Sequence, residues 1–149
     1  MRLRLTAVTI VVLVVAAGAC AIAAASANAR KAGPPVIHEK FTVLPCSGKP
    51  GDRTTLQLEG CAEHDVLAGD DRIDRLAAQI YGKLNTSGRR AFVSASTDWL
   101  SYRNAYCSAE ASPLSGGSEL PLAYADCLAT EDGLHLSDLR ALLKAISAP

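Results

Sequence analysis

The chain has 149 residues, of which 15 are Lys or Arg, 15 are Asp or Glu and five are Cys. This length favours a single domain over two full hydrophobic cores. The formal net charge is zero, so the chain does not have the excess of basic residues expected of a nucleic-acid-binding protein. Its apolar fraction of 49% excludes an intrinsically disordered chain.

Residues 1–29 have the pattern of an export signal. Two arginines precede the uncharged run 5–29, which is apolar at first and ends in Ala27-Asn28-Ala29. This order is typical of a cleaved secretory signal peptide. Two alternatives stay open, because residues 5–27 are long enough to anchor the chain in a membrane and the residues before Cys20 are similar to a lipoprotein cleavage site. All three predict a secreted or cell-envelope, extracytoplasmic protein.

Four cysteines remain in the exported part, and an even number favours two disulfides in an oxidising compartment. They are Cys46, Cys61, Cys107 and Cys127. The local pairing 46–61 and 107–127 is our prediction. The pairing 61–107 with 46–127 stays open, because a helical hairpin also brings Cys61 near Cys107. There is no C-x-x-C, and the three histidines do not have ligand spacing, so neither a metal nor a cofactor is expected.

Residues 30–53 are expected to form a linker that leads into the first helix, with a short extended stretch at 36–44. Helical periodicity then begins at Thr54, and apolar residues recur three, four, seven and eleven positions after Ile73, up to Leu84. Gly69-Asp70 is expected to bend or restart this helix. Asp70 or Asp71 would then cap its second part.

A polar break at 85–88 predicts a turn into a second helix antiparallel to the first. Its aromatic residues have near-heptad spacing and are expected to form a buried seam; these residues are Phe92, Trp99, Tyr102 and Tyr106. Trp99 should be largely buried between the two long helices. Arg103 should pack beside its ring, with an acid or backbone carbonyls holding the guanidinium.

Residues 111–125 are rich in Gly, Pro and Ser and are expected to form a loop, followed by a last short helix over about 132–146. The predicted fold is therefore all-α. It is a small helical hairpin stapled by two disulfides and completed by a third short helix, with the helical domain spanning 54–149.

The common catalytic patterns are absent from the sequence. It has no G-x-S-x-G, no H-E-x-x-H, no P-loop and no G-x-G-x-x-G. We therefore assign no catalytic residue and expect a protein that is not an enzyme.

One block of the sequence carries a family resemblance. The run from Trp99 to Cys107, the Gly-Gly-Ser loop and the later Cys127-Leu128 resemble the LprI-type lysozyme inhibitor N-terminal domain family, which is also described as a bacterial secreted domain of unknown function. The resemblance covers about 46–143 and includes the two early cysteines. Its signature residues here are Trp99, Tyr102, Arg103, Asn104, Gly116, Gly117 and Ser118.

The resemblance implies a protein-binding module that inhibits a lysozyme-type glycoside hydrolase. Residues 51–149 carry nine basic and 14 acidic groups, and this acidic balance suits a cationic partner. The candidate partner-binding groups are an acidic helix face and the loop Ser115–Glu119; the face comprises Glu59, Glu63, Asp70 and Asp74. The alternative is a structural or adaptor protein of the envelope without inhibitory activity.

Overall fold

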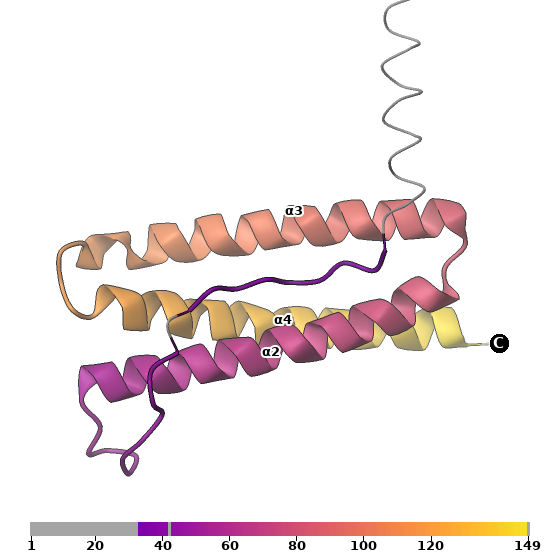
Figure 1. Ribbon diagram of the computed structural model, residues 1–149. Helices are drawn as coiled ribbons and strands as arrows, with labels where there is room; N and C mark the ends of the chain where they lie inside the picture. The colour runs from indigo at the N-terminus through magenta and orange to yellow at the C-terminus, as the bar shows by residue number, and fades with distance from the viewer. Residues whose placement is uncertain (1–32, 42, 149) are drawn as a thin grey trace, which may run out of the picture. The chain divides into compact units, whose positions relative to one another are not determined.

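The structure is a computed structural model that describes residues 33–41 and 43–148 (Figure 1). The elements are α2 (Thr55–Lys83), α3 (Thr86–Ala111), the 3-10 turn η1 (Ser112–Leu114) and α4 (Leu120–Ser147). The predicted all-α class is confirmed. The signal or anchor segment 1–29, including Cys20, lies outside the described residues. Within them, no helix has an apolar stretch long enough to cross a membrane.

Helix α2 begins where the sequence indicates but is not interrupted. The Thr54 side chain accepts a hydrogen bond from the Gln57 N–H, and the Gln57 side chain accepts one from the Thr54 N–H, which completes a capping box. The expected bend at Gly69-Asp70 is wrong, because the helix runs through both residues. A glycine in a helix interior costs about 0.5–1 kcal/mol. Contacts of Gly69 and Asp70 with the other helices offset that cost.

Helix α4 is much longer than the short helix expected. It has 28 residues and begins at Leu120, with Pro121 in its first turn. Proline is compatible with a helix start because the first N–H groups have no intrahelical acceptor. The loop expected at 111–125 is therefore reduced to η1 and Ser115–Glu119.

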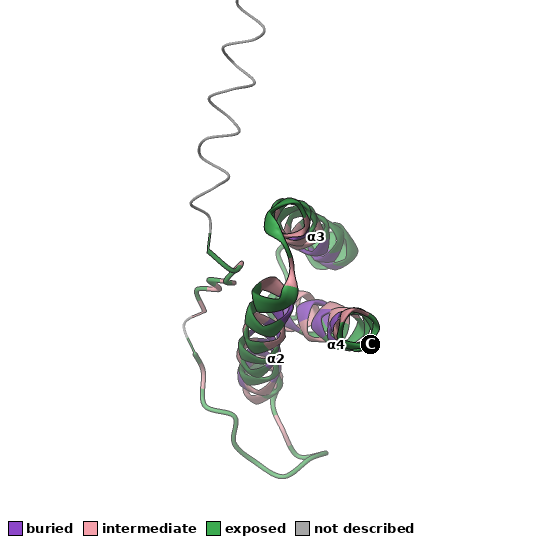
Figure 2. Ribbon diagram, turned by 90° about the vertical axis from the view of Figure 1, so that its right-hand side faces the viewer, coloured by how far each residue is buried: buried purple, intermediate pink, exposed green. Residues whose placement is uncertain are grey.

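The three long helices do not pack in the order that a simple hairpin suggests. Helices α2 and α4 run in the same direction and form the most extensive interface, while α3 runs antiparallel to both (Figures 1 and 2). Small residues on α2 allow this close approach. A Cβ placed on Gly69 would lie only 2.9 Å from Oδ2 of Asp132 on α4. The predicted turn between α2 and the antiparallel α3 is present, but α2 packs mainly against α4 and not against α3.

An extended segment that we call the strap, residues 34–41 and 43–44, runs along the helices between α2 and α3 (Figure 1). Its alternate residues are partly buried, and Ile37 and Phe41 pack against the core. The Ile37 N–H donates to Asp74 and the Leu44 N–H donates to Glu63, each at 3.0 Å. The segment expected as a linker is thus packed on the helices in the same compact unit.

The core consists of two apolar clusters, and buried residues line the facing sides of α2 and α4 in Figure 2. One cluster lies near the second disulfide and centres on Val66, Cys107 and Leu128. The other lies toward the opposite end and centres on Ile73, Ile80 and Leu136. The disulfides are Cys46–Cys61 and Cys107–Cys127, which is the local pairing.

Candidate functional site

A buried ionic layer lies between the two apolar clusters and centres on Arg103. The side chain is fully buried, and its Nη1 donates to Oδ1 of Asp70 at 2.8 Å and to Oδ1 of Asp132 at 2.6 Å. Its Nη2 pairs with Glu39 of the strap. One cation from α3 therefore joins α2, α4 and the strap.

The ionic layer holds more negative than positive charge. Burial and the Asp132 carboxylate raise the pKa of Asp70 to about 6, although the nearby Arg103 lowers it. Burial also raises the pKa of Asp132. Oδ2 of each aspartate is buried and receives no hydrogen bond in the described part of the chain. Protonation of either aspartate reduces the excess negative charge of the layer.

The side of α3 that faces the core differs from the predicted aromatic seam. Its buried residues are Phe92, Arg103, Cys107 and Ala111. Tyr102 and Tyr106 are 55% and 44% exposed, so their assignment to the seam is wrong. The error arose because Arg103 and Cys107, each one position further along, occupy the core side of the helix.

Trp99 is only half-buried, which corrects the expectation of a ring enclosed between the two long helices. Its ring stacks on His135 of α4, with ring centroids 3.8 Å apart and planes 9° apart. The Arg103 Cζ lies 5.3 Å from the Trp99 ring centroid, so the expected packing of arginine beside tryptophan is present. Burial lowers the pKa of His135, which favours the neutral ring in the stack.

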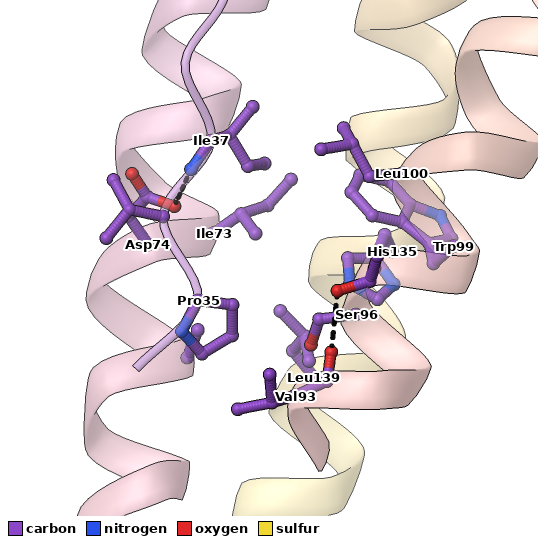
Figure 3. A pocket seen from close by; sticks show the side chains of 13 residues that line it. Pro35, Ile37, Ile73, Asp74, Val93, Ser96, Trp99, Leu100, His135 and Leu139 are labelled. Carbon is purple, nitrogen blue, oxygen red and sulfur yellow. Dashed lines mark hydrogen bonds between the residues drawn. The ribbon is translucent and has the colours of Figure 1, made fainter. Parts of the chain in front are cut away.

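A cavity of about 170 Å³ opens beside this stack, between the strap and the three helices (Figure 3). Ile37 and Ile73 approach it from one side and Leu100 and Trp99 from the other. Its lining is mainly apolar, and the hydroxyl of Ser96 is already bonded to the Phe92 carbonyl. Ser96 and His135 both line the cavity, and no hydrogen bond joins these two side chains in the described part of the chain.

The structure does not provide the exposed acidic face expected on α2. Glu63 and Asp70 are buried, at 6% and 5% exposure, while Asp74 and Glu59 are partly buried. Glu63 and Asp74 accept hydrogen bonds from N–H groups of the strap, and Asp70 binds Arg103. Three of the four carboxylates therefore make hydrogen bonds within the domain.

The loop residues have the accessibility expected of a contact segment. Every residue from Ser112 to Glu119 is exposed, including Gly116, Gly117 and Ser118, and Gly116 has a φ of +84° that favours glycine. The Cys107–Cys127 disulfide joins the two helices that carry this loop.

Sequence reasoning missed Glu39, Asp132 and His135 as members of the buried region. A signal for Asp132 was present, because it lies four residues after Leu128 and four before Leu136 on the apolar face of α4. Asp70 likewise occupies an apolar position, between Val66 and Ile73 on α2. An acid within an apolar repeat indicates a buried partner of opposite charge.

Fold and site together define a helical domain with two disulfides, in which the buried ionic layer around Arg103 joins the helices and the loop Ser115–Glu119 is exposed. The sequence model of the family described as "Lysozyme inhibitor LprI" matches residues 46–139, well over half of the chain. The chain therefore belongs to the LprI lysozyme inhibitor family. No curated protein and no solved structure matches it. Two disulfides suit the oxidising compartment outside the cytoplasm.

Proposed function

We propose that this protein is exported to the cell envelope or the medium, where it binds and inhibits a lysozyme-type muramidase. The family match carries the proposal, because the matched range 46–139 includes both disulfides, Arg103 and the exposed loop. The family description names an inhibitor, and the described residues offer no catalytic set. Inhibition by binding is therefore the function that the chain supports best.

The loop end of the domain supports the proposed mode of inhibition. The segment Ser115–Glu119 is short, exposed and joined to two helices that a disulfide holds together. Binding loops fixed in this way lose little conformational entropy on association. We place the loop in the carboxylate-lined cleft of the target, with acids near the loop attracting the cationic enzyme.

The test is a lysis assay on a cell-wall suspension with the purified, disulfide-bonded protein added in increasing ratio to lysozyme. Inhibition should be complete near one equivalent, and the complex should weaken with added salt. A Glu119→Lys variant should inhibit less than an Asp71→Lys variant, since both residues are exposed but only Glu119 lies in the loop. If the protein neither slows lysis nor forms a complex with lysozyme, and binds another envelope component instead, the adaptor alternative replaces inhibition.

A further inference from the structure

Two tyrosines of α3 are displayed on the surface of the domain. Tyr102 and Tyr106 are 55% and 44% exposed, and their rings stack with centroids 5.7 Å apart and planes 19° apart. Their neighbours in the Trp99–Cys107 block have partners within the fold: Trp99 stacks on His135, and Asn104 accepts a hydrogen bond from Arg103 Nε. The exposed rings are thus not required to fill the core.

Acidic groups surround the two rings. Asp98 and Glu110 are exposed and lie four residues before Tyr102 and four residues after Tyr106, so the four side chains share one face of α3. The negative charges of Glu110 and, to a smaller extent, of Glu131 on α4 raise the pKa of the Tyr106 hydroxyl. We call Asp98, Tyr102, Tyr106 and Glu110 the tyrosine strip.

The sequence that follows Arg103 lacks basic residues over a long stretch. Between Arg103, which is fully buried, and Arg140 the sequence contains six Asp or Glu residues and no Lys or Arg. This stretch includes the second half of α3, the loop and most of α4. Neither Asp98 nor Glu110 has a lysine or arginine three or four residues away along the chain to neutralise it.

We propose that the tyrosine strip binds arginine and lysine side chains of a basic protein partner. Aromatic faces attract guanidinium and ammonium groups, and adjacent carboxylates add charge-assisted hydrogen bonds. Tyrosine is also enriched among residues that dominate binding energy at protein interfaces. The inference rests on the proposed function for the identity of the partner, a cationic lysozyme. It specifies a second contact surface, on α3 beside the loop.

The test measures the affinity of the full protein for two probes, lysozyme and an eight-residue arginine peptide. The double variant Tyr102→Ala/Tyr106→Ala should bind both probes about tenfold more weakly or worse. The affinity of the double variant Tyr102→Phe/Tyr106→Phe should stay within about threefold of the wild-type affinity, because phenylalanine keeps the aromatic face. Leu56→Ala is the matched control, since this side chain is 59% exposed and lies at the start of α2.

A second pair of variants tests the charges. Asp98→Asn/Glu110→Gln should reduce the salt dependence of binding, while Asp71→Asn on α2 should leave it unchanged. Thermal unfolding of every variant should match the wild type, because the substituted side chains are exposed.

The outcomes separate this inference from the proposed function. If the wild type binds the arginine peptide but not lysozyme, and the Ala variant binds the peptide more weakly, the tyrosine strip is a cation-binding surface and lysozyme is not the target. Undiminished binding of both probes by the Ala variant overturns the strip and leaves the inhibitor proposal intact. If the wild type binds neither probe, both are overturned.

Discussion

Arg103 is the residue on which the interior most depends. Its removal would leave Glu39, Asp70 and Asp132 facing one another without a cation. Truncating one partner of a buried ionic group costs about 3–5 kcal/mol, because the remaining charges stay desolvated. We expect a loss of this size in the free energy of unfolding of Arg103→Ala, measured by urea denaturation.

Arg103→Lys is the control for this prediction. Lysine keeps the charge but cannot bind several carboxylates with a planar fork of donors, so an intermediate stability is expected. An Arg103→Ala protein with unchanged unfolding and no lysozyme binding would contradict a scaffold role and make Arg103 a contact residue.

Asp70 should make the stability of the domain depend on pH. Its pKa is about 6 in the folded protein against 3.8 for the free side chain, so the folded state binds the proton more tightly. Between about pH 4 and pH 6 the contribution of Asp70 to stability therefore decreases as pH rises. Asp70→Asn cannot titrate, and relative to wild type it should become more stable as pH rises through this window.

Urea unfolding at four pH values from 4 to 7 checks this prediction, with the exposed Asp71→Asn as control. His135 acts in the opposite direction, since its lowered pKa makes acid destabilising, but it is common to all three proteins and cancels in the comparison. Parallel stability curves for Asp70→Asn and wild type would show that Asp70 is not the titrating group.

At the scale of elements, the closeness of α2 and α4 depends on Gly69. A Cβ there would lie 2.9 Å from Oδ2 and 3.1 Å from Cβ of Asp132, and Arg103 holds that aspartate in place. Gly69→Ala should therefore destabilise the domain, although alanine is the better helix former.

Gly133 provides the matched comparison on α4. A Cβ at Gly133 meets no atom within 4 Å, so Gly133→Ala should raise the free energy of unfolding by about 0.5–1 kcal/mol. Chemical denaturation of the two variants side by side measures the difference. Equal stabilisation by both substitutions would mean that the helices are further apart than the structure indicates.

For the whole molecule, the Cys107–Cys127 disulfide should be a major source of stability. It joins α3 to α4 across 20 residues, and a closed loop of this size contributes about 3 kcal/mol in the chain-entropy model. The double variant Cys107→Ser/Cys127→Ser should lose that amount in denaturation at equilibrium. Peptide mapping without reduction checks the pairing, and a peptide linking Cys61 to Cys107 would refute it.

The N-terminal sequence makes a separate prediction about the mature protein. If 1–29 is a cleaved signal peptide, mass spectrometry of the exported protein should find a mature chain that begins near Arg30. An intact Met1 would indicate an uncleaved anchor. A lipidated Cys20 at the N-terminus would indicate a lipoprotein.

The sequence by itself determined the helical class of the fold and the family. Helix propensity, capping and apolar periodicity are local, so the all-α class, the start of α2 after Thr54 and the break near Asn85 were all predictable. The local disulfide pairing and the exposed loop were also correct. The Trp99–Cys107 block, together with the cysteines and the Gly-Gly-Ser loop, is sufficient to indicate the family.

Only the tertiary structure decided which polar groups are buried. Asp70 was expected on an exposed acidic face, but Arg103 from another helix lies opposite and makes its burial favourable. The rotation of α3 was missed for the same reason, since Arg103 takes a core position that periodicity assigns to apolar side chains. Local pattern does not specify which residues distant in sequence will meet. Buried ion pairing depends on that meeting, because a charge leaves water only when its partner is present.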